Sequence, residues 1–186
     1  MTVPMVTEES SVVAAASHAA RFWAMHGGFR AEVSDTLRVG QVHFTWSGQE
    51  PVLYRSFQRI REQLKQSVRP LTSRMEQRGG GVETIRILPG SNALPGYYQL
   101  FVTFRTSDAM GANFINSVLE AMASNFSSMV QSMGPEGELS VVMSILSNYT
   151  PQSRVTCSLE GDTKIFDGLD RQMSGNEFAR KFKLAV

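Results

Sequence analysis

The amino-acid sequence predicts an α+β fold, with a small domain whose antiparallel four-stranded sheet is covered by two helices. Three observations predict it. Four strand-like segments and two long amphipathic segments fill the middle of the chain. They follow one another in the order strand, helix, strand, strand, helix, strand. Segments outside this order flank it on both sides, so we expect the small domain, 39–148, to be inserted into a helix-rich larger domain formed by 1–38 and 149–186.

The composition is that of a globular protein. The 186 residues are 42% hydrophobic and 19% charged, with a formal net charge of +1, which gives no overall attraction to nucleic acid or to an anionic membrane. Cys157 is the only cysteine, so no internal disulfide can form. No apolar run approaches the roughly 20 residues of a membrane span, and 1–11 lack a signal-peptide pattern. We therefore expect a cytoplasmic protein that binds neither nucleic acid nor membrane.

The first predicted element is an alanine-rich helix over 11–25, which Gly27 and Gly28 end. Small side chains let another backbone come close, so we expect this helix to be tightly packed. Its apolar stripe consists of Val12, Val13, Ala16, Ala19, Ala20 and Trp23.

The inserted domain begins with a strand at 39–46, where apolar residues alternate with polar or smaller ones. A long helix follows, because Pro51 suits a first helical turn and apolar residues then recur every three or four positions. We expect Pro70 to kink or split this helix and the glycines at 79–81 to end it. Its apolar face comprises Leu53, Phe57, Ile60, Leu64, Val68, Leu71 and Met75.

Two strands, 82–88 and 97–105, come next, and their short connection favours antiparallel pairing. A helix over about 113–130 and a strand over 139–146 complete the domain. This order is the split βαβ, or ferredoxin-like, arrangement.

The flanking segments carry fewer signals. A strand pattern covers 153–160, and Ser174 with Glu177 three residues later predicts a capped helix start. Residues 2–6 have a strand-like composition, and the last helix has no stop signal, so we expect a piece of a longer protein.

The connection SDAMGAN, 107–113, leads from a strand into a helix. Ser107 or Asp108 could cap that helix in a purely structural role. A cap does not require Gly111, which permits close backbone approach to a ligand, or Asn113, whose amide both donates and accepts hydrogen bonds. Because a helix N-terminus offers unpaired N–H groups, the alternative is a phosphate-binding turn. The absence of a G-x-G-x-x-G sequence argues against a Rossmann domain.

The sequence resembles the class II, bacterial-type hydroxymethylglutaryl-CoA reductases. The resemblance rests on DAMGAN followed by FINSVLEA, on TEESSVVAAAS upstream and on ILSN at 145–148. It implies a nicotinamide-dependent enzyme that interconverts hydroxymethylglutaryl-CoA and mevalonate plus CoA by two hydride transfers. It also implies a ferredoxin-like cofactor domain inserted into a helix-rich substrate domain, and a homodimer or higher homo-oligomer.

The resemblance assigns the candidate cofactor-binding residues. The dinucleotide-binding turn comprises Asp108, Ala109, Met110, Gly111 and Asn113, with the backbone of Met110 and Gly111 near the pyrophosphate. Asn148 is similar to the asparagine that reaches the nicotinamide and substrate region.

Glu50 falls near the acidic position that bonds the adenosine ribose in NAD-preferring relatives. Its negative charge would repel a ribose phosphate, so we expect NAD(H) rather than NADP(H). The alternative for Glu50 is a charged residue in a first helical turn.

The family's catalytic motifs do not occur in the sequence: E-N-V-I-G with its glutamate, the lysine after H-N, the aspartate of G-N-D and the histidine near the end. We expect no catalytic residue here and no turnover by this chain alone. His18, His26 and His43 have no metal-ligand spacing, so we expect no metal.

The sequence is also compatible with two other functions. Tyr97, Tyr98, Phe101 and Phe104 on one strand could stack on the bases of a nucleic acid, although the Lys/Arg-Gly-Phe/Tyr pattern of such modules is missing. The other possibility is a structural interaction module.

Overall fold

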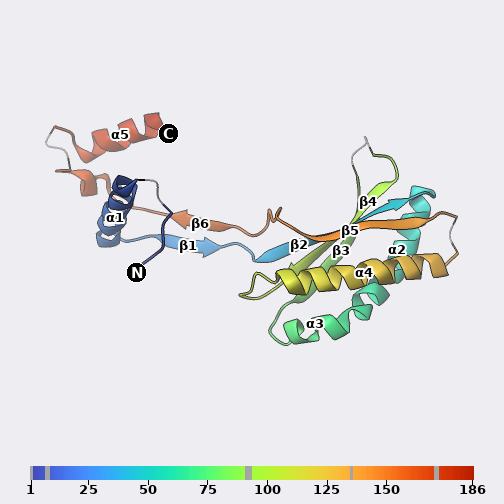
Figure 1. Ribbon diagram of the computed structural model, residues 1–186. Helices are drawn as coiled ribbons and strands as arrows, with labels where there is room; N and C mark the ends of the chain where they lie inside the picture. Colours follow the sequence, from blue (N-terminus) through green and yellow to red (C-terminus); the bar gives the residue numbers. More distant parts are fainter. Residues whose placement is uncertain (1, 7–8, 91–93, 135, 170–171) are drawn as a thin grey trace. The chain divides into compact units, whose positions relative to one another are not determined.

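The structure is a computed structural model that describes residues 2–6, 9–90, 94–134, 136–169 and 172–186 (Figure 1). It divides into two compact units. We call Val33–Arg154 the core unit, and Met1–Glu32 with Val155–Val186 the flanking unit. The predicted small domain, 39–148, lies within the core unit.

The core unit contains the elements β2 (Leu37–Trp46), α2 (Glu50–Ser67), α3 (Arg69–Glu76), β3 (Gly81–Pro89), β4 (Tyr97–Arg105), α4 (Ala112–Ser132) and β5 (Leu139–Ser147). Its four strands form one sheet in the order β3-β4-β2-β5, and every neighbouring pair is antiparallel. The α+β class and the antiparallel four-stranded sheet are therefore confirmed.

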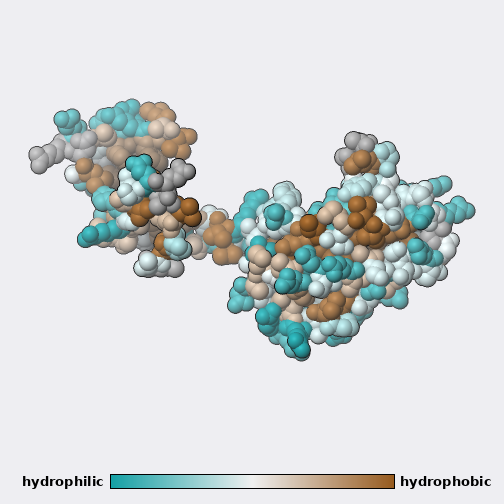
Figure 2. Space-filling model, viewed as in Figure 1, coloured by the Kyte–Doolittle hydropathy of each residue, from teal (hydrophilic) through white to brown (hydrophobic). Residues whose placement is uncertain are grey.

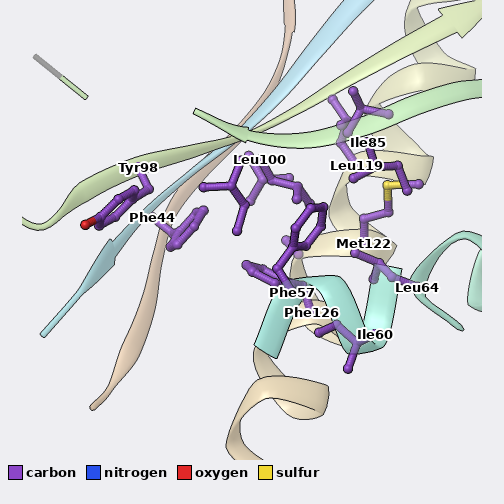
Figure 3. Packing of buried hydrophobic residues seen from close by; sticks show 14 of the residues in the cluster. Phe44, Phe57, Ile60, Leu64, Ile85, Tyr98, Leu100, Leu119, Met122 and Phe126 are labelled. Carbon is purple, nitrogen blue, oxygen red and sulfur yellow. The ribbon is translucent and has the colours of Figure 1, made fainter. Parts of the chain in front are cut away.

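The hydrophobic core lies between the sheet and the helices. α4 packs on β2 and β5, and α2 packs on α4 and β3. Phe126 of α4 sits at the centre (Figure 3), edge-on to Phe44 of β2 at 5.3 Å between ring centroids and to Phe57 of α2 at 6.2 Å. Burying an aromatic side chain contributes roughly 1.5–3 kcal/mol, so such contacts fix α4 against the sheet.

The break in the long helix is where the sequence predicts it. α2 ends at Ser67 and α3 begins at Arg69, with Pro70 in the first turn of α3. Proline has no N–H to donate, which is harmless in a first turn. After α3 the chain passes so close to β4 that a Cβ on Gly80 would lie 2.4 Å from the carbonyl oxygen of Arg105.

The edge of the sheet formed by β5 carries exposed apolar side chains. β5 has no charged residue, and Val141, Val142, Met143 and Ile145 are all exposed. Figure 2 shows hydrophobic residues gathered over this strand.

The flanking unit contains α1 (Ser10–Met25), all but the last residue of β1 (Arg30–Val33), β6 (Val155–Ser158), the short 3-10 helix η1 (Thr163–Phe166) and α5 (Gly175–Ala185). β1 pairs with β6. The predicted cap is confirmed, because Ser174 Oγ accepts a hydrogen bond from the Glu177 N–H at 3.3 Å. Residues 2–6 form no regular secondary structure.

The prediction of a tightly packed first helix is wrong. No residue of α1 is buried. Phe22 and Trp23, near its C-terminal end, contact Phe166, with ring centroids 5.7 and 5.8 Å apart. Alanine permits close packing but supplies little apolar area of its own, so it does not draw a neighbour onto the helix. In the described part of the chain, no helix is both long and apolar enough to cross a membrane.

Candidate functional site

The strand-to-helix connection is a tight turn over 106–111. Thr106 is buried, and its hydroxyl donates to the Ala109 carbonyl oxygen at 2.6 Å, while the Ala109 N–H donates to the Thr106 carbonyl at 3.1 Å. Ser107 has a positive φ of 54°, and its hydroxyl donates to the Arg78 carbonyl at 2.8 Å. These bonds fasten the turn to itself and to the segment that follows α3.

Gly111 sets the start of α4. It is the N-cap residue, with a left-handed φ of 75°, and its carbonyl accepts the Ile115 N–H at 2.9 Å. A Cβ at this position would lie 2.6 Å from Cγ2 of Thr106. Glycine is therefore required twice, by the backbone conformation and by the close approach of Thr106.

The helix start has no side-chain cap. The interpretation of Ser107 or Asp108 as the N-cap is therefore wrong, because the left-handed glycine places the helix start three residues further on. The first N–H groups of α4 lack a side-chain acceptor and carry the positive end of the helix dipole. This arrangement suits an anionic ligand.

The surface of the turn is accessible. Asp108, Met110 and Asn113 are exposed, and Met110 shows 66% of its surface. Ala109 and Gly111 are half-buried. A ligand can therefore reach the five residues that the sequence assigns to the turn.

Asn148 lies at the same end of the sheet as this turn. It follows β5, whose last residue, Ser147, pairs with Val39, while Leu37 pairs with Arg105 just before the turn. The Leu146 N–H also donates to Oδ1 of Asn116 in α4 at 3.0 Å. The fold therefore brings the end of β5 and the start of α4 to one edge.

Glu50 lies at the opposite end of the sheet. It begins α2, beyond the end of β2, and accepts a hydrogen bond from the Tyr98 hydroxyl at 3.3 Å. Burial and the charge of Glu50 raise the pKa of Tyr98. At about 3.3 Å per residue, β2 separates Glu50 from the turn by roughly 30 Å. The fold does not bring Glu50 together with the other predicted site residues.

The sequence did not reveal a charged pocket near the turn, which has two basic and two acidic side chains. A cavity of about 460 Å³ is lined by Lys65, Gln66, Arg69, Glu76, Gly80, Val82 and Glu83. It adjoins the turn through Gly80, which touches the last residue of β4. The signal that could have found it is Arg69 directly before Pro70, because a cation at the start of a helix is unfavourable and favours an anion nearby.

Arg105 holds the end of β4 in place. Its guanidinium bonds Glu83 at 3.0 Å and Asp35 at 3.1 Å. The hydrogen bond to Glu83 and the charge of Asp35 raise the pKa of Arg105. Both partners are partly exposed, so the pairs orient the strand end more than they stabilise it.

The structure weakens the nucleic-acid interpretation. Two of the four aromatic residues of β4, Tyr98 and Phe104, are buried in the core at 6% and 0% exposure, so they cannot stack on bases. Within the described ranges, no group of three or more His, Cys, Asp or Glu side chains is placed to hold a metal ion.

The antiparallel α+β unit, with a helix that starts inside DAMGAN and has no side-chain cap, agrees with the fold and the motif on which the resemblance to the class II reductases rests. A model of the hydroxymethylglutaryl-coenzyme A reductase family matches residues 1–185, and the chain belongs to this family.

Relatives support the assignment. The chain is 31% identical over 153 residues to a probable 3-hydroxy-3-methylglutaryl-coenzyme A reductase of Borreliella burgdorferi, covering 82% of this chain and 33% of that protein. It is 29% identical over 121 residues to the reductase of Archaeoglobus fulgidus, covering 65% and 28%. The chain thus spans about a third of the length of these relatives.

Solved structures agree with the fold. The class II reductase of Streptococcus pneumoniae, bound to NADPH in open conformations, matches with a TM-score of 0.81 and 31% identity, over 98% of this chain and 47% of that chain. Another structure of the Streptococcus pneumoniae enzyme matches with the same TM-score and 32% identity, over 98% of this chain and 41% of that chain.

The predicted preference for NAD(H) over NADP(H) is wrong. It is contradicted by the Streptococcus pneumoniae relative, which was solved with NADPH. The physical reason for the error is the position of Glu50. A carboxylate at the far end of the sheet cannot repel a ribose phosphate bound near the turn.

Proposed function

We propose that this chain is the nicotinamide-cofactor-binding part of a reductase that interconverts hydroxymethylglutaryl-CoA and mevalonate plus CoA, with NADP(H) as cofactor. The observation that carries the proposal is the turn over 106–111, where Gly111 starts α4 with no side-chain cap. The cofactor supplies the hydride, and the residues of this chain bind and orient it.

The turn supplies the contacts that a diphosphate needs. The backbone N–H groups at the start of α4 donate hydrogen bonds, and the helix dipole adds partial positive charge. Thr106 and Ser107 hold the turn in position through their hydroxyls, so little ordering is needed when the ligand binds. Asn113, exposed in the first turn of α4, adds a side-chain amide.

The two cations of the charged pocket support NADP(H), because its carboxylates, Glu76 and Glu83, lie within ion-pair distance of Arg69 and Arg105. A ribose phosphate carries up to two negative charges, and Arg69 and Lys65 line the cavity beside the turn. Arg69 is 3.9 Å from Glu76, but its side chain is 69% exposed, so this ion pair leaves donors free for a phosphate. We place the ribose phosphate against Arg69.

In this proposal the chain by itself binds the cofactor but does not catalyse the reaction. None of the family's catalytic motifs is in the sequence, so no side chain is assigned to protonate a leaving group or to stabilise an oxyanion. The substrates, CoA and a homodimeric or larger assembly remain predictions for the whole enzyme, as does its cytoplasmic location.

Fluorescence titration with NADPH and NADH tests the proposal. We expect saturable binding of NADPH that is tighter than that of NADH. Arg69→Gln should weaken NADPH about tenfold or more and leave NADH nearly unchanged, because one charge-assisted hydrogen bond contributes about 1.5–3 kcal/mol.

Arg59→Gln is the matched control. Arg59 is exposed on α2 and lines a different cavity, so its removal makes the same change in charge away from the turn. A folded chain that binds neither nucleotide would contradict the proposed function. Equal loss of NADPH affinity in both variants would contradict the role of Arg69.

A further inference from the structure

One buried polar atom has no partner. Among all side-chain nitrogen and oxygen atoms of the described residues, Nε of Arg38 is the one that is inaccessible to solvent and makes no hydrogen bond. A buried donor without an acceptor loses its hydration and gains no bond in return, and the loss is greater for a charged group. Such an atom in a native protein calls for an explanation, and one explanation is an anion or ligand that supplies the missing acceptor.

Arg38 lies on the face of the sheet that α4 covers. Residues two apart on a strand point to the same side, and Arg38 is followed on that side by Gly40, Val42 and Phe44. A Cβ on Gly40 would touch Leu119 and Ile115 of α4, at 2.6 and 3.1 Å. α4 and β2 therefore pack together along this row of residues.

The position of Arg38 in this row places it beneath the start of α4. Phe44, further along β2, packs on Phe126, and Gly40 packs on Ile115 and Leu119. Each step back along β2 thus reaches an earlier turn of the helix, and Arg38 is one step beyond Gly40. Its cross-strand partner is Phe104, whose ring is 6.0 Å from that of Phe114 in the first turn of α4.

The acidic groups nearby do not neutralise Arg38. Asp35 is bonded to Arg105 and to the Thr36 N–H, and Glu83 is bonded to Arg105. Asp108 is exposed on the turn and forms no ion pair within 4.0 Å in the described structure. A guanidinium with an unused donor thus lies under the same helix start whose N–H groups have no cap.

We propose that Arg38 binds the diphosphate of the cofactor from below, together with the first turn of α4. This inference rests on the proposed function, because it assigns a further residue to the same cofactor site. Arginine matches phosphate oxygens with paired N–H donors, and Arg38 is a half-buried arginine whose Nε has no other acceptor. In the free chain Nε of Arg38 has no hydrogen-bond acceptor, and in this proposal a phosphate oxygen of the bound diphosphate becomes its acceptor.

Arg38→Met tests the inference, because methionine keeps much of the apolar volume and removes the guanidinium donors. We expect the free variant to be at least as resistant to urea as the wild type. We also expect its affinity for NADPH, and for inorganic pyrophosphate as a competitor, to fall about tenfold or more. Affinity for adenosine 2′-monophosphate, which has no diphosphate, should stay within about twofold.

Arg86→Gln is the matched control, since Arg86 is also on a strand but lies over the ring of Phe101, and it should bind NADPH as the wild type does. Wild-type affinity of Arg38→Met for both NADPH and pyrophosphate would overturn the role of Arg38 and leave the proposed function standing. If the folded wild-type chain binds neither NADPH nor pyrophosphate, both proposals are overturned.

Discussion

At the residue scale, Gly111 decides the geometry of the turn. Any other residue at this position would be destabilised in two separate ways, by the left-handed φ of 75° and by the clash of its Cβ with Thr106. Gly134, with φ of 61° and open space around its Cβ position, isolates the first effect. We expect Gly134→Ala to cost about 1 kcal/mol and Gly111→Ala to cost more, about 2–4 kcal/mol, with weaker NADPH binding. Urea denaturation measures both, and equal losses would contradict the role assigned to Thr106.

His43 gives a pH-dependent prediction at the same scale. It lies on β2, and its Nδ1 is 2.5 Å from the Tyr97 hydroxyl. Burial lowers the pKa of His43 from its ordinary value of 6.5. The unfolded chain therefore binds the proton at a higher pH than the folded chain. Stability should be greatest above about pH 6.5 and should fall as the pH drops toward the lowered pKa.

The matched variant is His43→Gln. It removes the titrating group, so its unfolding free energy should vary less between pH 7.5 and pH 5 than that of the wild type. Urea titrations at several pH values measure this difference. An identical pH dependence in the two proteins would show that His43 does not titrate as stated.

The sequence predicted which residues form the turn but not why each is needed. DAMGAN identified the site by resemblance, whereas the clash between Gly111 and Thr106 depends on a contact that no spacing reveals. The distance of Glu50 from the other predicted site residues was hidden for a similar reason. Its position near the start of a helix was right, but only the strand register shows which end of the sheet that helix occupies. Arg38 appeared as an ordinary strand residue until its surroundings were known.

At the element scale, α4 links the core to the site. Phe126 is fully buried and contacts both Phe44 and Phe57. Phe126→Ala should cost about 3–5 kcal/mol in the unfolding free energy, because it leaves a cavity between the helix and the sheet. Met110→Ala, at a residue with 66% exposure, should change it by less than about 0.5 kcal/mol. Urea denaturation compares the two, and a loss below about 1 kcal/mol for Phe126→Ala would contradict the central place of α4.

Elements with a strong hydrophobic period were predicted well, whereas β1 and the packing of α1 were not. The strands of the four-stranded sheet and the helices above it alternate or repeat clearly, because each buries one face. β1 was missed because all four of its residues are exposed, so its sequence shows no alternation. The prediction that α1 is tightly packed failed because the sequence of a helix shows its own side chains but not which other elements lie against it.

At the scale of the whole molecule, the chain consists of two units with separate contacts. The core unit has its own hydrophobic core between sheet and helices. Residues 33–154 expressed by themselves should therefore fold cooperatively. Circular dichroism and urea denaturation check this expectation, and a segment that stays unfolded would show that the core unit depends on the flanking unit.

The central claim is that the start of α4 binds the cofactor, and Asn113→Asp tests it most directly. This nearly isosteric change adds a negative charge at an exposed position in the first helical turn, where it should favour the helix by about 0.3–1 kcal/mol. The same charge should repel a diphosphate. The control is Gln131→Glu, which adds an equal charge near the other end of α4. NADPH titration should show at least about tenfold weaker binding by Asn113→Asp and unchanged binding by Gln131→Glu, whereas wild-type affinity in both would contradict the account.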